Sequence, residues 1–145
     1  MKQLKIIMII LVLTAASLHL SAHCEIPCGI YEDALRIGLM REHATTIEKS
    51  MTQIMVLEKE KEINYNQLVR WINNKEEHAV KLQDIVARYF MTQRIKPDAA
   101  DYDQKISTLH KMLVSAMKCK QTTDLKNINE LRSLIDRFEE LYLKK

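Results

Sequence analysis

The stretch that decides the fold spans residues 37–54 and reads IGLMREHATTIEKSMTQI. Its apolar residues recur at alternating spacings of three and four, at Ile37, Met40, Ala44, Ile47, Met51 and Ile54. An α-helix turns once in 3.6 residues, so this spacing places all six on one face and polar residues on the others. We therefore predict a long amphipathic helix that buries one face against other helices.

Three stretches further along the chain repeat this pattern. The second stripe is interrupted by Lys75 and consists of Leu68, Trp71 or Ile72, Ala79, Leu82, Val86 and Tyr89. The remaining two stripes are Ile106, Leu109, Leu113 and Ala116, followed by Ile128, Leu131, Ile135, Phe138 and Tyr142. No segment alternates polar and apolar residues as a strand does. With two glycines and two prolines in 145 residues, the chain is predicted to be all-α, an antiparallel four-helix bundle.

Local signals set the expected helix boundaries. Breaks fall near residues 64–66, 95–98 and 122–124. We expect the charged run at 58–62 to be the solvated end of the first helix. Pro97 disfavours helix in the residue before it. Asp98 is expected to cap the third helix, with Asp101 in a capping-box position three residues later.

The first 22 residues have the layout of a secretory signal peptide. Two lysines, at positions 2 and 5, precede an apolar run over residues 6–16, and Leu20-Ser21-Ala22 supplies a small residue at a cleavage point. Cleavage by signal peptidase after Ala22 divides the chain into a removed segment, 1–22, and one mature domain, 23–145. The mature protein is expected to be exported, to the periplasm or the medium, and to leave the membrane after processing.

Two other interpretations of this leader are weaker. A spanning helix needs about 20 predominantly apolar residues, whereas residues 6–22 are fewer and include two serines, a threonine and a histidine. A lipoprotein signal needs a small residue directly before the modified cysteine, and His23 occupies that place before Cys24.

The mature chain would begin with HCEIPCGIY, residues 23–31. The α-amine of His23 and the backbone amide of Cys24 close a five-membered chelate ring with a metal, and that amide and the Cys24 thiolate close a second. The Cys28 thiolate can reach the fourth corner because Pro27 and Gly29 favour a turn. Two nitrogens and two sulfurs in one plane suit Ni(II) or Cu(II), while zinc demands a tetrahedron. The His23 imidazole can add an axial ligand.

The run His-Cys-x-x-Pro-Cys-Gly-x-Tyr at a processed N-terminus resembles the nickel hook of the nickel-containing superoxide dismutases. The resemblance implies one nickel ion per subunit, bound by His23, Cys24 and Cys28. It implies an antioxidant enzyme that converts superoxide to oxygen and hydrogen peroxide by Ni(II)/Ni(III) cycling. It also implies a homohexamer of four-helix bundles with an N-terminal metal-binding hook.

The resemblance assigns further residues around the metal. Tyr31 corresponds to the tyrosine of the family's hook, and Tyr89 resembles a second tyrosine that approaches the site. Family members orient the axial imidazole through a glutamate and an arginine. Those places hold Gly38 and His78 here, which makes His78 a candidate for the supporting role. Arg41, Glu42 or His43 are candidates for the missing partner.

Charge excludes one class of function and suggests an approach path for the substrate. The formal net charge is +3, and removal of the two lysines of the leader leaves +1, which is too balanced for nucleic-acid binding through bulk charge. Superoxide is an anion, so cations near a cleft would raise its encounter rate. The candidates are Lys75, Arg88, Arg94 and Lys96.

Three cysteines leave two other functions open. The hook accounts for Cys24 and Cys28, and Cys119 is expected to be a packed or idle thiol near a helix end. One alternative function is an exported copper or nickel carrier that uses the same donors without turnover. The other is a secreted helical interaction protein with a Cys24–Cys28 disulfide, which would contain no stoichiometric metal.

The first prediction is that the mature protein begins at His23. A free α-amine is a different donor from an acylated one, so the metal plane requires cleavage at this bond. Intact-protein mass spectrometry of the protein from its native host measures the N-terminus. A metal-loaded, active protein that retains even one residue of the leader would contradict the hook.

Overall fold

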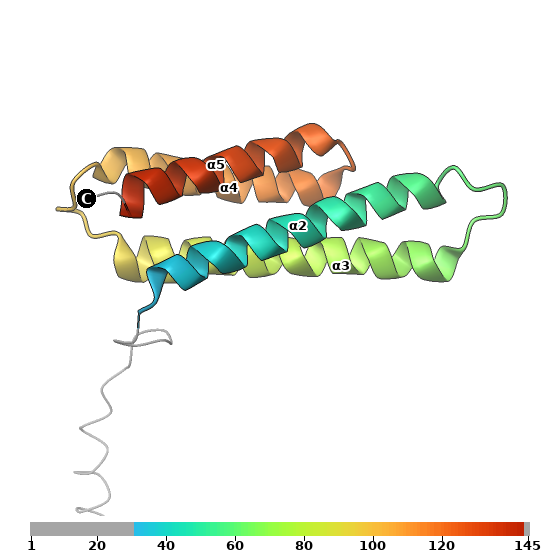
Figure 1. Cartoon of the computed structure of the whole chain (residues 1–145), viewed down its shortest axis with the longest axis horizontal. Coiled ribbons are helices and arrows are strands. Elements are labelled where there is room, and N and C mark those ends of the chain that lie inside the picture. Colours follow the sequence, from blue (N-terminus) through green and yellow to red (C-terminus); the bar gives the residue numbers. More distant parts are fainter. Residues whose placement is uncertain (1–30, 144–145) are drawn as a thin grey trace, which may run out of the picture. The chain divides into compact units, whose positions relative to one another are not determined.

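The structure, a computed structural model, describes residues 31–143. In chain order its helices are α2 (Asp33–Leu57), α3 (Tyr65–Asp84), η2 (Ile85–Arg94), α4 (Tyr102–Gln121) and α5 (Leu125–Leu143). Because η2 continues α3 without a break, these elements form four helical rods, and residues 31–143 contain no strand (Figure 1). The predicted all-α four-helix bundle is confirmed. The predicted signal peptide and hook ligands lie outside the described residues.

The helices pack as two antiparallel hairpins. α2 pairs with α3 and α4 pairs with α5, and the hairpins meet where α2 contacts α5 and α3 contacts α4. Figure 1 shows the α2–α3 hairpin extending past the turn between α4 and α5. At the opposite end, the start of α2 meets the ends of η2 and α5, because Asp33 bonds to Arg94 and Tyr142.

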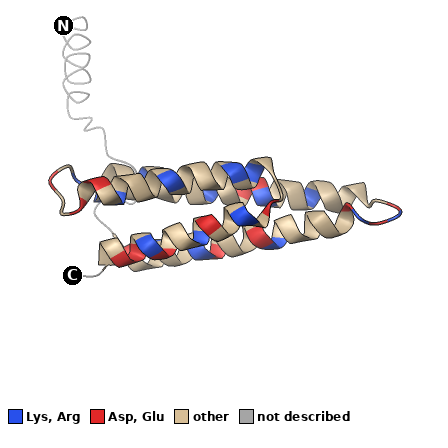
Figure 2. Cartoon of the chain, turned by 90° about the horizontal axis from the view of Figure 1, so that it is seen from above, with Lys and Arg blue, Asp and Glu red and all other residues tan. Residues whose placement is uncertain are grey.

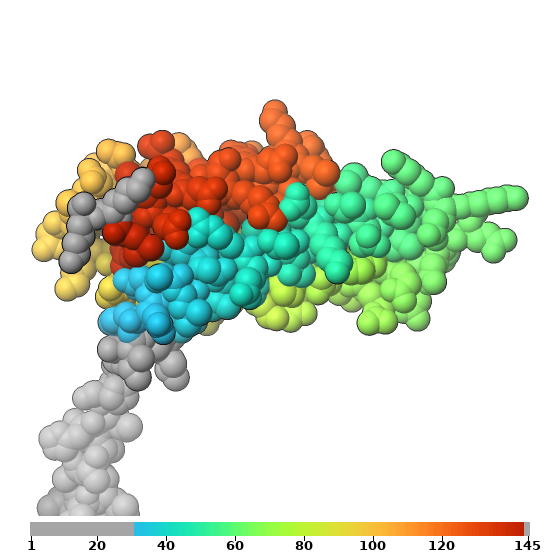
Figure 3. Space-filling model, in the orientation of Figure 1, coloured from blue at the N-terminus to red at the C-terminus, as the bar shows by residue number. Residues whose placement is uncertain are grey.

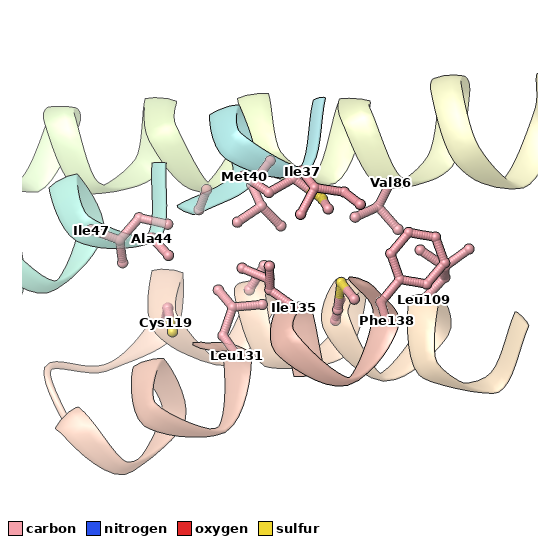
Figure 4. Close-up of a cluster of buried hydrophobic side chains, with 14 of the residues drawn as sticks. Ile37, Met40, Ala44, Ile47, Val86, Leu109, Cys119, Leu131, Ile135 and Phe138 are labelled. Carbon is pink, nitrogen blue, oxygen red and sulfur yellow. The ribbon is translucent and has the colours of Figure 1, made fainter. Parts of the chain in front are cut away.

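The predicted apolar stripes form the core. The stripe of α2 is confirmed in full, since all six of its residues are buried, and Figure 4 shows four of them facing side chains of the other helices. The aromatic rings of Phe90 and Phe138 meet edge to face within this core, with centroids 4.8 Å apart.

Two of the predicted stripes differ in detail from the observed core. In α4 the expected Leu113 is only partly buried, and the preceding Met112 fills the core instead. Leu68 and Trp71 are also only partly buried, because their part of α3 lies in the extended end of the hairpin.

The last ten residues of the second rod form a π-helix, a wider turn than the sequence stripe predicts. The amide of Ile95 donates to the carbonyl of Phe90, five residues earlier, at 2.9 Å. The Thr92 hydroxyl likewise donates to the carbonyl of Ala87 at 2.7 Å. In this geometry residues five apart lie above one another, so Tyr89 and Arg94 point the same way. Such π-turns are rare and occur often at functional sites.

Two predicted helix boundaries are wrong. Residues 58–62 form turns and bends beyond α2, which ends at Leu57. Asp98 does not cap α4, because residues 96–102 form successive tight turns and the helix begins at Tyr102. Asp101 takes the cap position in a left-handed conformation, with φ of 55°, and its side chain makes no capping bond. Aspartate tolerates this conformation better than most residues.

Lys75, which interrupts the second stripe, is buried for a structural reason. Its side chain is 5% exposed, and its Nζ donates to the carbonyls of Lys120 at 2.5 Å and of Thr122 at 3.5 Å. These carbonyls terminate α4, where a helix has unpaired acceptors and a partial negative charge. Lys75 therefore caps a neighbouring helix and joins the two hairpins.

Charged side chains cover the outside of the bundle without forming one basic or acidic face. Figure 2 shows lysines and arginines interspersed with aspartates and glutamates along all the rods. One cross-helix group joins Arg41 on α2 to Asp136 and Glu139 on α5, each at 2.7 Å. None of the helices within residues 31–143 is long and apolar enough to cross a membrane.

Candidate functional site

The end of the bundle at which α2 begins is organised around one carboxylate. Oδ1 of Asp33, at the start of α2, accepts hydrogen bonds from Tyr89 Oη at 2.6 Å and Arg94 Nε at 2.8 Å. Oδ2 accepts from Arg94 Nη2 at 2.7 Å and Tyr142 Oη at 2.9 Å. These four residues, the Asp33 cluster, link α2, η2 and α5. In Figure 3 the blue start of α2 lies against the yellow and red segments that supply the partners.

The contacts within the Asp33 cluster shift the pKa values of its carboxyl and of its two phenols. Burial on its own raises the pKa of Asp33, but the hydrogen bonds from Arg94, Tyr89 and Tyr142 outweigh burial, and the pKa is lowered from 3.8. Burial and the bond to the Asp33 carboxylate raise the pKa of Tyr89 to about 12, and the same causes raise that of Tyr142 to about 12. At neutral pH the carboxylate is therefore ionised and both phenols are protonated.

The structure brings Tyr31 and Tyr89 together, as the resemblance implies. Their ring centroids are 6.0 Å apart in an edge-to-face arrangement. Tyr89 is 4% exposed, whereas Tyr31, three residues after Cys28, is 38% exposed. The guanidinium of Arg94 lies 4.3 Å from the ring centroid of Tyr31, and that of Arg36 lies 5.1 Å from the centroid of Tyr89. Cation–π contacts at these distances are attractive.

His78, the other residue assigned by resemblance, meets His43 across the α2–α3 contact. Their Nδ1 atoms are 3.0 Å apart, a hydrogen bond in which one ring donates and the other accepts. Burial, the neighbouring imidazole and Lys81 lower the pKa of His43. Burial and Lys81 also lower the pKa of His78. The pair is therefore neutral at physiological pH.

The other candidates near the missing glutamate are accounted for. Arg41 bonds to Asp136 and Glu139 of α5, so it is not free to support an imidazole. A side chain added at Gly38 would meet no atom within 4 Å. Crowding therefore does not explain why position 38 holds a glycine where the family has a glutamate. His43 contacts His78 through the hydrogen bond between their Nδ1 atoms.

No group of three or more metal-binding side chains exists within the described part of the chain. Cys119 is fully buried on α4, and burial raises the pKa of its thiol to about 11. The expectation of a packed thiol is confirmed. Because a thiol must lose its proton to bind a metal, the raised pKa makes Cys119 a poor metal ligand.

Comparison with known families identifies the chain. The sequence model of the nickel-containing superoxide dismutases matches residues 18–145, which include the hook motif and the entire described bundle. The chain belongs to this family. No curated protein and no solved structure matches it.

Membership of this family establishes the enzyme class, the substrate and the metal. The protein is a superoxide dismutase, an oxidoreductase that acts on superoxide and uses a nickel ion. The predicted enzyme class and cofactor are confirmed. The ligands and the residues that act around the metal stay predictions, since the hook lies outside the described residues.

Three of the four cations predicted to steer superoxide have other partners in this nickel-containing superoxide dismutase. Lys75 caps α4, and Arg94 forms an ion pair with Asp33 at 2.7 Å. Arg88 lies 3.5 Å from Asp84 of the same helix. Lys96 is exposed in the loop after η2.

Sequence reasoning missed the central role of Asp33 and the contribution of Tyr142. Asp33 was visible only as an acid near a helix start, and Tyr142 only as the last residue of an apolar stripe. Their meeting depends on how α2 and α5 pack, for which one sequence carries no signal. The π-turn that aligns Tyr89 with Arg94 was equally invisible.

We predict that Asp33→Asn lowers the free energy of unfolding by about 2–4 kcal/mol, because it removes a shielded charge that pairs with Arg94. Tyr142→Phe, which removes one of the four hydrogen bonds, is the matched control and should cost about 1 kcal/mol. The native pKa of Asp33 is lowered, so its contribution is present above pH 3.8 and is lost as the pH falls through the native pKa. Urea unfolding followed by circular dichroism measures both. Equal costs for the two variants would contradict the central role of the carboxylate.

The histidine pair predicts a second pH dependence, near neutrality. Both native pKa values lie below the ordinary value of 6.5, so the unfolded chain binds protons first as the pH falls. The free energy of unfolding should therefore decrease from about pH 7.5 to about pH 5, and this slope should be smaller in His78→Gln. His110→Gln, at an exposed position of α4, should keep the wild-type slope. Identical slopes in all three proteins would show that the pair does not titrate as described.

Proposed function

We propose that this enzyme is an exported superoxide dismutase whose processed N-terminus holds its nickel ion. The ligands are His23, through its α-amine and imidazole, Cys24, through its amide and thiolate, and Cys28, through its thiolate. The observation that carries the proposal is the complete hook motif at residues 23–31, within the segment that matches the family.

Nickel held by these donors would supply a one-electron couple, Ni(II)/Ni(III), which is the chemistry that dismutation of superoxide needs. Thiolates and a deprotonated amide are strong electron donors, and they lower the potential of the couple into the range where superoxide reacts with both states. Backbone nitrogen and thiolate donors at this spacing would also favour Ni(II) over zinc, which demands a tetrahedron.

The bundle contributes two tyrosines at the place where the hook joins it. Asp33 holds the hydroxyl of Tyr89, and Arg94 holds Asp33 and packs on the ring of Tyr31. Both rings are thereby oriented by the rigid end of the bundle. We assign Tyr31 and Tyr89 the role of limiting access to small molecules and of ordering water or peroxide beside the metal.

We assign His78 the place of the family's supporting arginine, with His43 as its own partner. The change replaces a permanent positive charge with a neutral pair that forms a hydrogen bond across α2 and α3. A metal-bound histidine generally needs an orienting partner on its second nitrogen. In this protein that support would come from an imidazole, whose charge depends on pH.

Export, processing and assembly complete the proposal. Signal peptidase removes residues 1–22, and the mature enzyme acts in the periplasm or outside the cell as a homohexamer. Exposed apolar side chains at the extended end of the α2–α3 hairpin support assembly, among them Val56 (51% exposed), Tyr65 (69%) and Val69 (52%). Apolar patches of this kind commonly mark protein interfaces.

The proposal predicts that Cys24→Ser and Cys28→Ser each abolish superoxide consumption and strongly reduce bound nickel, because each removes a thiolate ligand. Cys119→Ser is the control and should keep both activity and nickel, since this thiol is buried and protonated. Circular dichroism should show unchanged helicity in all three, because the apolar stripes that form the core do not use the two hook cysteines and serine is close in size to Cys119. Metal analysis and a superoxide decay assay make the test.

Three outcomes would contradict parts of the proposal. Nickel retained at full occupancy in both hook variants would overturn the ligand assignment. Copper instead of nickel in the native protein, without turnover, would favour the carrier. Blocked thiols and no metal would favour the disulfide-bonded interaction protein.

A further inference from the structure

A groove between α2 and α3 has the size of a site for a small molecule. It has a volume of about 430 Å³, and sites for small molecules typically have volumes between about 300 and 1,000 Å³. Its lining consists of Thr46, Lys49, Gln67, Arg70, Trp71 and Asn74. Lys49 lies about 24 Å along the axis of α2 from Asp33, so the groove is separate from the Asp33 cluster.

The side chains that line the groove offer two kinds of contact. Lys49 on α2 and Arg70 on α3 bring one positive charge from each helix. Trp71, the single tryptophan of the chain, is only partly buried and supplies a flat apolar surface. The Nζ of Lys49 lies 5.9 Å from the centre of the Trp71 ring, at the limit of a cation–π contact. A molecule with both a ring and an anionic group would find a partner for each part.

Hydrogen bonds across the two helices hold the base of the groove. The Nδ2 of Asn74 donates to the hydroxyl of Ser50 at 2.9 Å, and this hydroxyl donates to the carbonyl of Thr46 at 2.8 Å. Ser50 is fully buried, so both bonds lie beneath the surface. They fix the spacing of α2 and α3 beside Trp71 and Lys49. A site that is formed before its ligand arrives loses less conformational freedom on binding.

We propose that this groove binds a small aromatic molecule that carries a carboxylate or a phosphate. The ring packs on Trp71, and the oxyanion lies between Lys49 and Arg70. A guanidinium binds two oxygens of such a group through its planar fork, and the flexible side chain of a lysine turns to meet it. Two positive charges at one groove also repel each other, and a bound anion relieves this repulsion. The inference uses residues of the bundle alone and does not depend on the nickel site.

The experiment titrates the purified enzyme with four probes and follows Trp71 fluorescence and the heat of binding. Phenyl phosphate and benzoate each combine a ring with an oxyanion, whereas inorganic phosphate lacks the ring and benzamide lacks the charge. The tighter of the first two should bind at least about tenfold more tightly than inorganic phosphate and benzamide, because each of these loses one contact. Which of the two binds more tightly identifies the oxyanion that the groove prefers.

Substitutions in the lining test each contact separately. Lys49→Gln and Arg70→Gln should each weaken binding of the tighter probe by about three- to tenfold, with a loss that shrinks above about 0.1 M salt. Trp71→Leu, measured by calorimetry, should weaken it by a similar factor. Lys126→Gln is the matched control, because it removes one exposed positive charge at the start of α5 and should leave the affinity unchanged. Circular dichroism should show wild-type helicity in the charge variants, since Lys49 and Arg70 are exposed.

Several results would overturn the inference. One is the lack of any binding of phenyl phosphate and benzoate at millimolar concentration. Another is an equal effect of Lys126→Gln, which would show attraction to the whole surface and not to the groove. Benzamide bound as tightly as benzoate would rule out the contact with the oxyanion. If Trp71→Leu does not fold, inorganic phosphate bound as tightly as phenyl phosphate would rule out the contact with the ring.

Discussion

One carboxylate at the start of α2 organises the functional end of this protein. Asp33 accepts four hydrogen bonds from three side chains, and these come from η2 and α5. The bonds are short and charge-assisted, which makes them stronger than bonds between neutral groups. They fix the point at which the N-terminal segment joins the bundle. They also fix Tyr89, which packs against Tyr31, so that both aromatic rings take their positions from Asp33.

The π-helical turn of η2 is the local feature that makes this cluster possible. Tyr89 and Arg94 are five residues apart, and an ordinary α-helix would turn them toward different neighbours. The wider turn stacks them, so both reach the same carboxylate. An energetically unfavourable backbone is thus offset by bonds to a charged group. The buried Lys75 likewise satisfies polar groups that the backbone leaves unpaired, because it donates to a carbonyl at the C-terminal end of α4.

The protein divides its chemistry between two parts with different requirements. In the proposed function the hook would supply the redox-active donors, for which the order of a few residues and a free N-terminus matter. The bundle supplies rigidity, aromatic walls and charge. The guanidinium of Arg94 illustrates this role, because it packs on the ring of Tyr31 while both oxygens of Asp33 balance its charge.

The sequence by itself determined the helical class, the stripe of α2, most of the core of α5 and the family to which the chain belongs. Helical periodicity and a nine-residue chelate motif are local, so they can be read from one chain. The tertiary structure alone decided that Asp33 and Tyr142 meet, that His43 pairs with His78, and that Lys75 caps α4. It also decided that the third helix starts at Tyr102 and not beside Asp98, because tight turns occupy the residues between them. Each of these contacts joins residues whose proximity depends on packing or on a non-standard turn. That is the physical reason why the pattern of apolar residues could not reveal them.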